Sequence, residues 1–360
     1  MYLTELQKSY DDFFSKLIDE SKIFLITPTN LEEEKKLFFK TKNYNPVFEY
    51  NEMNEITRMY FNIIQNLSPL KNKSSVDKIL NAKQREIKLK FKLSSSIGKD
   101  SFTNLSIRAY GKPSEHLIKE ATKILKLPYK KTKRSFYSSD ETISELKTKF
   151  KDLGIRKWKV IKTDLSNSAS VNCETRQLKL KKRERMSKKF VERLKVHEIE
   201  THALRYENGR QQCFKILKYG FPNYISTEEG LAVYSEEKHG VLSKSILRNY
   251  AGRVLAIHFA LQLSFDKTYK KLLKYFDKNT AFKLTVRAKR GLKDTSKPGA
   301  FTKDIIYLKG YLEVKKFAQN NNLTQLYVGK IGIKDISKVS KLNFVKDPKI
   351  LPDFLKESNV

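Results

Sequence analysis

Two histidines separated by five positions constrain this chain more than any other feature. His197 and His202 flank Glu198 in the pattern H-E-x-x-x-H, and only five histidines occur among the 360 residues. Upstream, Phe190 and Leu194 precede His197 at helical spacing, which predicts an amphipathic helix through this segment. The helix is expected to begin after an N-cap at Ser187 and to end at Gly209. Both histidines are therefore expected on one helix.

The spacing of the pair predicts a local distortion of that helix. In the H-E-x-x-H motif of zinc peptidases the histidines are four residues apart, about 40° around the helix, so both reach one ion. Five residues place them roughly 140° apart on an ideal α-helix. One extra residue accommodated as a π-bulge returns the second histidine to the face of the first. We therefore predict a bulge between Glu198 and His202.

A catalytic zinc needs a third protein ligand and one open position for water. Glu229, in the downstream segment STEEGLAVYSEE, is our candidate, and Gly230 beside it would let another backbone approach closely. Glu198 would take the proton of the metal-bound water. The alternative is that His197 and His202 are ordinary histidines of a helix, and that Glu228 and Glu229 are solvent-exposed acidic residues at the start of the next one.

The two motifs carry a family resemblance. HEIETH followed by TEEGLA is similar to the HEIGTH and QEGLA signatures of the microtubule-associated tyrosine carboxypeptidase family, including its bacterial members. The resemblance continues through AYGKPSEHLIKEA (Ala109–Ala121) and through RAKRGLKDTSKPGAFTKDIIYLKGYLEV (Arg287–Val314). It implies one zinc ion per chain, bound by His197, His202 and Glu229, with Glu198 as the catalytic base. It also implies removal of a C-terminal residue, and tyrosine is the substrate known for the animal members.

Two positions depart from the family pattern. Glu200 stands where a glycine is expected, which places an extra carboxylate either near the metal or on the outer face of the helix. Glu228 replaces the usual glutamine, so the choice between Glu228 and Glu229 as ligand depends on alignment to the motif. A preference for tyrosine finds no support in the residues of this chain.

The amino-acid composition limits the cellular compartment and the classes of partner that we expect for this chain. No stretch approaches the roughly 20 apolar residues of a membrane span, and the N-terminal segment lacks the apolar region of a signal peptide. Cys173 and Cys213 fit neither a metal motif nor a disulfide framework, so we expect a cytoplasmic protein with no membrane partner. The formal net charge of +33 favours an acidic peptide tail or a nucleic acid as partner. However, the lysines are spread along nearly every segment, as a general compositional bias would also produce.

The order of predicted elements indicates an α+β fold that is mostly helical and zincin-like, with a small β-sheet before the H-E-x-x-x-H helix. We expect residues 1–134 to form a helical support region and residues 135–360 the zinc metallopeptidase region, with the boundary in Leu127–Ser135. The strands are expected at Arg156–Thr163, Ser168–Asn172 and Arg176–Lys182. Ser168–Asn172 would be an edge that binds an extended peptide, or else part of an ordinary hairpin.

A carboxypeptidase must recognise the carboxylate at the end of a chain, and a fixed cation near the metal does so. Arg287, Arg290 and Lys303 are our candidates, with Tyr307 as a hydrogen-bond donor to the carboxylate or to the oxyanion. Each of them could instead be a surface residue. Two other functions stay open: a zinc endopeptidase or aminopeptidase, and a basic nucleic-acid-binding protein with a structural metal site.

Overall fold

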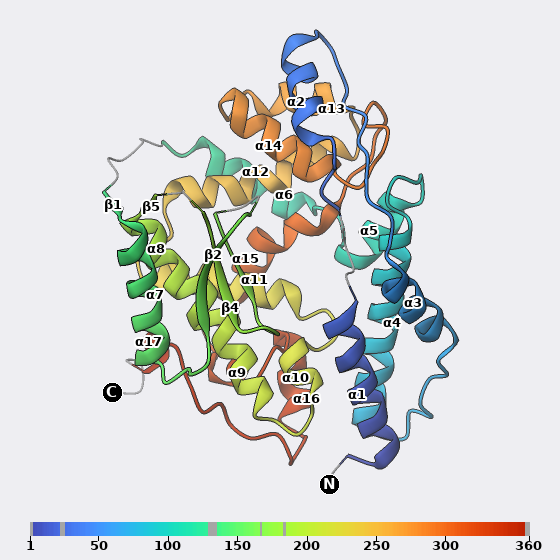
Figure 1. The fold of residues 1–360 in the computed structure, drawn as a ribbon, viewed down its shortest axis with the longest axis vertical. Helices are drawn as coiled ribbons and strands as arrows, with labels where there is room; N and C mark the ends of the chain where they lie inside the picture. Colours follow the sequence, from blue (N-terminus) through green and yellow to red (C-terminus); the bar gives the residue numbers. More distant parts are fainter. Residues whose placement is uncertain (1–2, 22–25, 129–134, 166–167, 183–184, 357–360) are drawn as a thin grey trace.

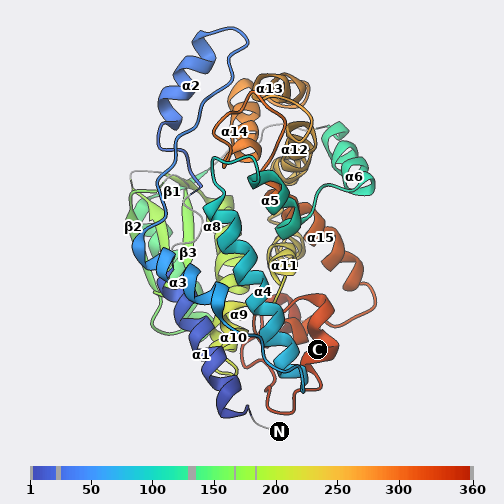
Figure 2. The ribbon, with the colours of Figure 1, turned by 90° about the vertical axis from the view of Figure 1, so that its right-hand side faces the viewer.

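The computed structural model describes residues 3–21, 26–128, 135–165, 168–182 and 185–356. Within these ranges helices dominate and two small sheets lie to one side (Figure 1), as expected for an α+β fold. The N-terminal helix α1 and the long helix α4 run side by side, and α3 lies across them (Figure 2). Helix α4 begins at a capping box in which Ser74 and Asp77 satisfy each other's backbone N–H groups. The first six helices are α1 (Glu5–Glu20), α2 (Leu31–Lys40), α3 (Glu55–Asn66), α4 (Ser75–Ser95), α5 (Phe102–Tyr110) and α6 (Glu115–Lys126).

The three predicted strands form one sheet in the order β2-β4-β3. Strand β4 (Gln177–Lys181) pairs in parallel with β2 (Lys159–Thr163) and antiparallel with β3 (Ala169–Asn172). Leu178 and Leu180 of β4 are buried in the core. Strand β3 is thus an edge, as predicted, and it lies against the helix that carries the histidines. Strands β1 (Phe136–Tyr137) and β5 (Met186–Ser187) form a separate two-stranded ladder.

The histidine helix is one continuous helical rod in three parts. Ser187 accepts the N–H of Phe190 and caps it, as predicted. The rod comprises α8 (Lys188–Leu194), the π-helical segment η1 (Lys195–Ala203) and α9 (Leu204–Arg210). The remaining elements are α7 (Ser139–Asp152), α10 (Ile216–Tyr219), α11 (Ile225–Lys238), α12 (Lys244–Ala260), α13 (Phe265–Leu272), α14 (Lys278–Lys289), η2 (Thr302–Ile305), α15 (Ile306–Phe317), η3 (Thr324–Tyr327), η4 (Ile333–Asp335), α16 (Ile336–Val339) and α17 (Asp353–Lys356).

Two glycines let α11 and α15 touch backbone to backbone. A Cβ placed on Gly230 would lie 2.1 Å from the carbonyl carbon of Gly310, and one on Gly310 would lie 1.9 Å from the carbonyl oxygen of Ser226. Neither position has room for any side chain. The predicted role of Gly230 is therefore confirmed, and α15 is the helix that approaches it.

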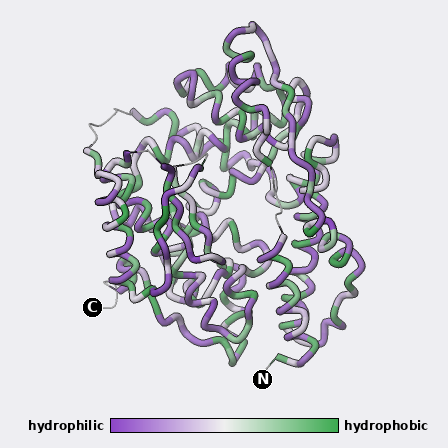
Figure 3. The backbone as a smooth tube through the Cα atoms, viewed as in Figure 1, coloured by the Kyte–Doolittle hydropathy of each residue, from purple (hydrophilic) through white to green (hydrophobic). Residues whose placement is uncertain are grey.

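The hydrophobic core joins early and late parts of the chain. Phe14 and Phe91 from the N-terminal helices belong to the same buried cluster as Leu194 and Ile199 of the histidine helix. The division at residue 134 stays a prediction, and residues 129–134 of its boundary lie outside the described residues. Hydrophilic residues recur along nearly every element rather than gathering in one part (Figure 3). Among the described residues, no helix combines the length and apolar character needed to cross a membrane.

Candidate active site

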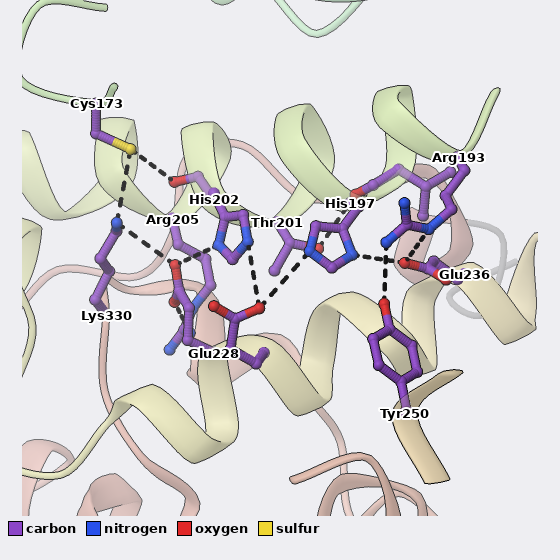
Figure 4. Close-up of polar contacts among 12 residues, drawn as sticks. Cys173, Arg193, His197, Thr201, His202, Arg205, Glu228, Glu236, Tyr250 and Lys330 are labelled. Atoms are coloured by element: carbon purple, nitrogen blue, oxygen red, sulfur yellow. Dashed lines mark hydrogen bonds and ion pairs between the residues drawn. The ribbon is translucent and has the colours of Figure 1, made fainter. Parts of the chain in front are cut away.

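The π-helical segment brings both histidines to one face. The N–H of Leu204 bonds the carbonyl of Ile199, five residues back, and the Thr201 hydroxyl bonds the carbonyl of Val196. As a result the rings of His197 and His202 lie 5.0 Å apart between centroids, on the side that faces α11 (Figure 4). The bulge predicted from the five-residue spacing is confirmed.

Each histidine is oriented by a carboxylate on α11. Nδ1 of His197 lies 2.6 Å from Glu236 Oε1, and Nδ1 of His202 lies 2.8 Å from Glu228 Oε1. In the neutral rings these contacts favour the tautomer with hydrogen on Nδ1, so that the lone pair lies on Nε2. Although burial alone would lower the pKa of His197, its contacts with Glu229 and Glu236 raise that pKa to about 9. Binding of a metal would therefore displace a proton from this ring.

An arginine compensates each of these buried carboxylates (Figure 4). Arg193 donates from Nε to Glu236 at 2.9 Å and from Nη2 to the hydroxyl of Tyr250. Arg205, fully buried, forms an ion pair with Glu228 and also donates to three backbone carbonyls between residues 326 and 331. Burial favours the neutral form of Glu228, but the charges of Arg205 and Lys330 hold its pKa well below the usual range. The Glu228 carboxylate thus stays ionised without a metal.

Glu229, not Glu228, lies beside both free ring nitrogens. Its Oε2 is 3.7 Å from Nε2 of His197 and 3.9 Å from Nε2 of His202. One atom from each of these three residues falls within 4.8 Å of the others. Glu228 is turned toward Nδ1 of His202 and toward Arg205, which favours Glu229 as the ligand, and that assignment stays a prediction.

The two acidic residues of η1, Glu198 and Glu200, face opposite directions. Glu198 is partly exposed and forms no hydrogen bond or ion pair with another residue that the structure describes. Glu200 is 1% exposed and lies on the outer face of the helix, where Lys149 approaches within 2.5 Å and the N–H of Asp353 donates to it. Of the two positions that the sequence allowed for the Glu200 carboxylate, the structure shows the one directed away from His197 and His202.

Three of the four predicted substrate-binding residues, Arg287, Lys303 and Tyr307, are near enough to Glu229 for its charge to act on them. Arg287 and Arg290 both pair with the buried Asp304, at 2.5 Å and 3.3 Å. Burial lowers the pKa of Lys303 while the Glu229 carboxylate counteracts this, and the Glu229 charge also acts on Tyr307. Lys303 forms no ion pair within the described ranges. Arg287 and Arg290 are thus held by Asp304, whereas Lys303 has no carboxylate within ion-pairing distance among the described residues.

Sequence reasoning missed several residues of the site. Glu236 lies seven residues after Glu229 on α11, and Arg193 lies four residues before His197, so helical periodicity could have placed both near the histidines. Arg205 and Lys330 gave no such signal, because they stand among 73 lysines and arginines and only the tertiary structure distinguishes them.

The family model for the microtubule-associated tyrosine carboxypeptidase matches residues 35–360. The chain belongs to this family. Microtubule-associated tyrosine carboxypeptidase 1 of Mus musculus is 32% identical over 176 residues, which cover 47% of this chain and 37% of that protein. The putative tyrosine carboxypeptidase MATCAP2 of Mus musculus is 33% identical over 174 residues, 46% of this chain and 33% of that protein. The match thus spans about a third of the length of these curated relatives.

We predict that the purified chain binds one zinc ion and that replacing both His197 and His202 by alanine removes it, because two of the three ligand atoms are lost. Inductively coupled plasma mass spectrometry of both proteins after incubation with zinc measures this. His258→Ala, on α12, is the control and should retain the ion. Equal zinc in the double variant and the wild type would contradict the assigned site.

We also predict that Glu236→Gln weakens zinc binding about 10- to 100-fold without abolishing it, because His197 loses the carboxylate that orients its ring. Titration against a competing chelator measures the affinity. Glu237→Gln, on the next residue of α11, removes a carboxylate that pairs with Lys315 instead and should leave the affinity unchanged. An unchanged affinity in Glu236→Gln would show that this carboxylate has no part in the site.

Proposed function

We propose that this chain is a zinc-dependent metallocarboxypeptidase that hydrolyses the C-terminal residue of a peptide or protein. The observation that carries the proposal is the convergence of His197, His202 and Glu229, next in sequence to a Glu198 that pairs with none of the described residues. Membership of a family described as a tyrosine carboxypeptidase supports the reaction class, since sites with this geometry occur in peptidases of several kinds.

The donor set fits zinc. Two imidazole nitrogens and one carboxylate oxygen are a ligand set of catalytic zinc sites, and in this chain both rings are already oriented through Nδ1. When bound there, zinc lowers the pKa of water to about 7 and polarises a carbonyl. The chain's own residues then have to supply the proton transfers and hold the substrate.

Glu198 is the residue placed for proton transfer. Its carboxylate follows the first histidine directly, is partly exposed, and forms no hydrogen bond or ion pair with any residue of the described ranges 3–21, 26–128, 135–165, 168–182 and 185–356. In the proposed reaction it takes one proton from the attacking water and delivers it to the leaving amine, while the water oxygen bonds to the peptide carbon and the C–N bond breaks. Glutamine at this position keeps the shape of the side chain but cannot accept the proton.

Two parts of the chain would hold the substrate on either side of this centre. The free edge of β3 lies against η1, and an extended peptide can add to it through main-chain hydrogen bonds. We also expect Lys303 to bind the terminal carboxylate, whose negative charge would favour the protonated lysine, and Tyr307 to donate its hydroxyl beside Glu229. Arg287 and Arg290 would act less directly, by fixing Asp304 and the start of α15.

The relatives' names give tyrosine as the residue removed and microtubules as the associated structure. We carry both to this chain only as expectations: a protein tail as substrate, acidic in view of the net charge, in the cytoplasm. Tyrosine is thus one terminal residue to test. An endopeptidase or aminopeptidase, and a nucleic-acid-binding protein with a structural metal, are the outcomes that the experiments below would reveal instead.

We predict that Glu198→Gln lowers kcat for release of the terminal residue at least 100-fold while the zinc content stays at the wild-type level, because only the base is lost. Mass spectrometry of the peptide products and of the metal measures both quantities. Glu192→Gln, on the same helix and facing Lys195, is the matched control. Hydrolysis that survives in Glu198→Gln would assign the base to another residue.

We predict that amidating the C-terminus of a substrate peptide lowers kcat/KM roughly 10-fold or more, because the amide cannot pair with Lys303. In Lys303→Gln the free-acid and amidated peptides should be processed at similar rates. Cleavage of the amidated peptide at an internal bond would identify an endopeptidase, and release of the first residue an aminopeptidase.

If the tail is acidic, its attraction to this basic protein is screened by salt. We predict that kcat/KM for an acidic-tail peptide falls steeply between low and physiological ionic strength, whereas a neutral peptide with the same last two residues changes little. Parallel rate measurements at a series of salt concentrations test this. Equal salt dependence for the two peptides would exclude long-range attraction, and a salt-dependent shift of labelled RNA or DNA that survives Glu198→Gln, without peptide hydrolysis, would favour the nucleic-acid alternative.

A further inference from the structure

A late segment of the chain lies along the histidine helix. We call residues 346–356 the strap, and it ends in α17, which lies beside α7 (Figure 1). The strap runs in the opposite direction to the histidine helix, so that later strap residues contact earlier helix residues. Its residues Phe354 and Leu355 are buried in the same cluster as Leu194 and Ile199. The strap therefore belongs to the core around the π-helical segment η1.

Two buried side-chain amides hold the strap at the far end of the histidine helix. Asn208 of α9 donates to the carbonyl of Ile350 at 2.7 Å and accepts the N–H of the same residue at 3.1 Å. Gln212, just after α9, does the same with Lys346, at 2.8 Å and 2.9 Å. Each amide thus satisfies one backbone N–H and one backbone carbonyl of the strap. Neither of these contacts reaches η1.

A third contact, which involves charge, reaches η1 itself. The carboxylate of Glu200 accepts the N–H of Asp353 at 3.2 Å, and its other oxygen lies 2.5 Å from Nζ of Lys149 on α7. Lys149 also pairs with the Asp353 carboxylate at 2.6 Å. Nε2 of His239, at the end of α11, lies 3.4 Å from the Glu200 oxygen that faces Asp353. Residues of α7, α11 and α17 therefore surround one carboxylate of η1.

This contact is harder to break than the amide contacts. Although burial lowers the pKa of Lys149, its contacts with Asp353 and Glu200 raise that pKa above the ordinary value, so the lysine is charged. Glu200 is 1% exposed. Breaking a buried ion pair from one side is costly, because the remaining charge loses its partner. The Glu200 contact is therefore the strong link between η1 and the strap.

A π-helical turn needs such support from outside. π-Helices are rare and occur mostly as single turns within α-helices, so the extra residue of η1 has to be held by tertiary contacts. On the inner side, Glu236 and Glu228 hold the rings of His197 and His202. On the other side, Glu200 is held by the strap and by α7. Without this second contact η1 is free to relax toward an α-helix, which turns the second ring by about 100° relative to the first.

We propose that Glu200 is a positioning residue of the candidate metal site. By joining η1 to Lys149 and to the strap, it maintains the π-helical turn and thereby the common direction of His197 and His202. Its own carboxylate points away from both rings, so it acts only through the helix. The inference depends on the metal site proposed above. It follows that a segment that supplies no ligand contributes to the affinity for zinc.

The test measures zinc affinity and ligand geometry in Glu200→Gln. This variant keeps the size of the side chain and an acceptor for the Asp353 N–H, but it loses the charge that pairs with Lys149. We expect the zinc affinity, measured by competition with a chelator, to fall about tenfold although all three ligands remain. The visible spectrum of the cobalt-loaded protein should also change, because it depends on the ligand geometry.

Two further variants separate positioning from general stability. Lys149→Met breaks the same ion pair from α7, and binding in the double variant with Glu200→Gln should be about as weak as in either single variant. Lys149→Met also carries the test should Glu200→Gln fail to fold. Gln212→Ala breaks a strap contact outside η1, so it should lower the melting temperature of the metal-free protein but leave the zinc affinity and the cobalt spectrum unchanged.

The outcomes distinguish this inference from the proposed function. Wild-type zinc affinity and cobalt spectrum in Glu200→Gln and Lys149→Met, even with a lower melting temperature, would overturn the positioning role. An equal loss of zinc affinity in Gln212→Ala would overturn it too, because the effect would then not come from η1. A wild type that binds neither zinc nor cobalt would refute the metal site itself, and with it the proposed function and this inference.

Discussion

The five-residue turn within η1 is the constraint on which the rest of the site depends. With an unbroken α-helix, His197 and His202 would point roughly 140° apart, and no arrangement of α11 could serve both. The π-helical segment restores a common face, and α11 then lies along that face with Glu228, Glu229 and Glu236 directed at it. The one extra residue in η1 therefore determines that Glu228, Glu229 and Glu236 of α11 can contact the two histidine rings.

The buried charges around the histidines form two similar chains. In one, His197 bonds Glu236, which bonds Arg193, which in turn bonds the hydroxyl of Tyr250. In the other, His202 bonds Glu228, which is paired with Arg205. Removing one member of such a buried pair costs about 3–5 kcal/mol, because its partner is left charged and unpaired. Because the carboxylates are held in place at this cost, each of them fixes the orientation of the histidine ring that it contacts.

Local patterns in the sequence predicted the elements well and the tertiary partners poorly. The strands at residues 159–181, the helix capped by Ser187, the bulge and the close approach at Gly230 all follow from spacing or from a residue's own conformational preference. The side of the helix on which Glu200 lies was left open, because the position of a residue on a helix does not show which element packs against it. Arg205 and Lys330 gave no signal because a basic residue is informative only once its burial and neighbours are known. Asp304 was likewise missed, although its pairing with Arg287 and Arg290 is what fixes two of the predicted substrate residues.

The glycine contact between α11 and α15 has a mechanical consequence. Glu229 precedes Gly230 on one helix, and Tyr307 lies one turn before Gly310 on the other, so the two backbones share a fixed register at their point of contact. The candidate metal ligand Glu229 and the candidate substrate-binding residue Tyr307 are thereby fixed relative to each other by one rigid contact between α11 and α15. Neither helix can slide along or rotate against the other without a backbone collision, so the spacing between the two groups is set before any substrate arrives. Adaptation to substrates of different size would have to come from the side chains and from the β3 edge.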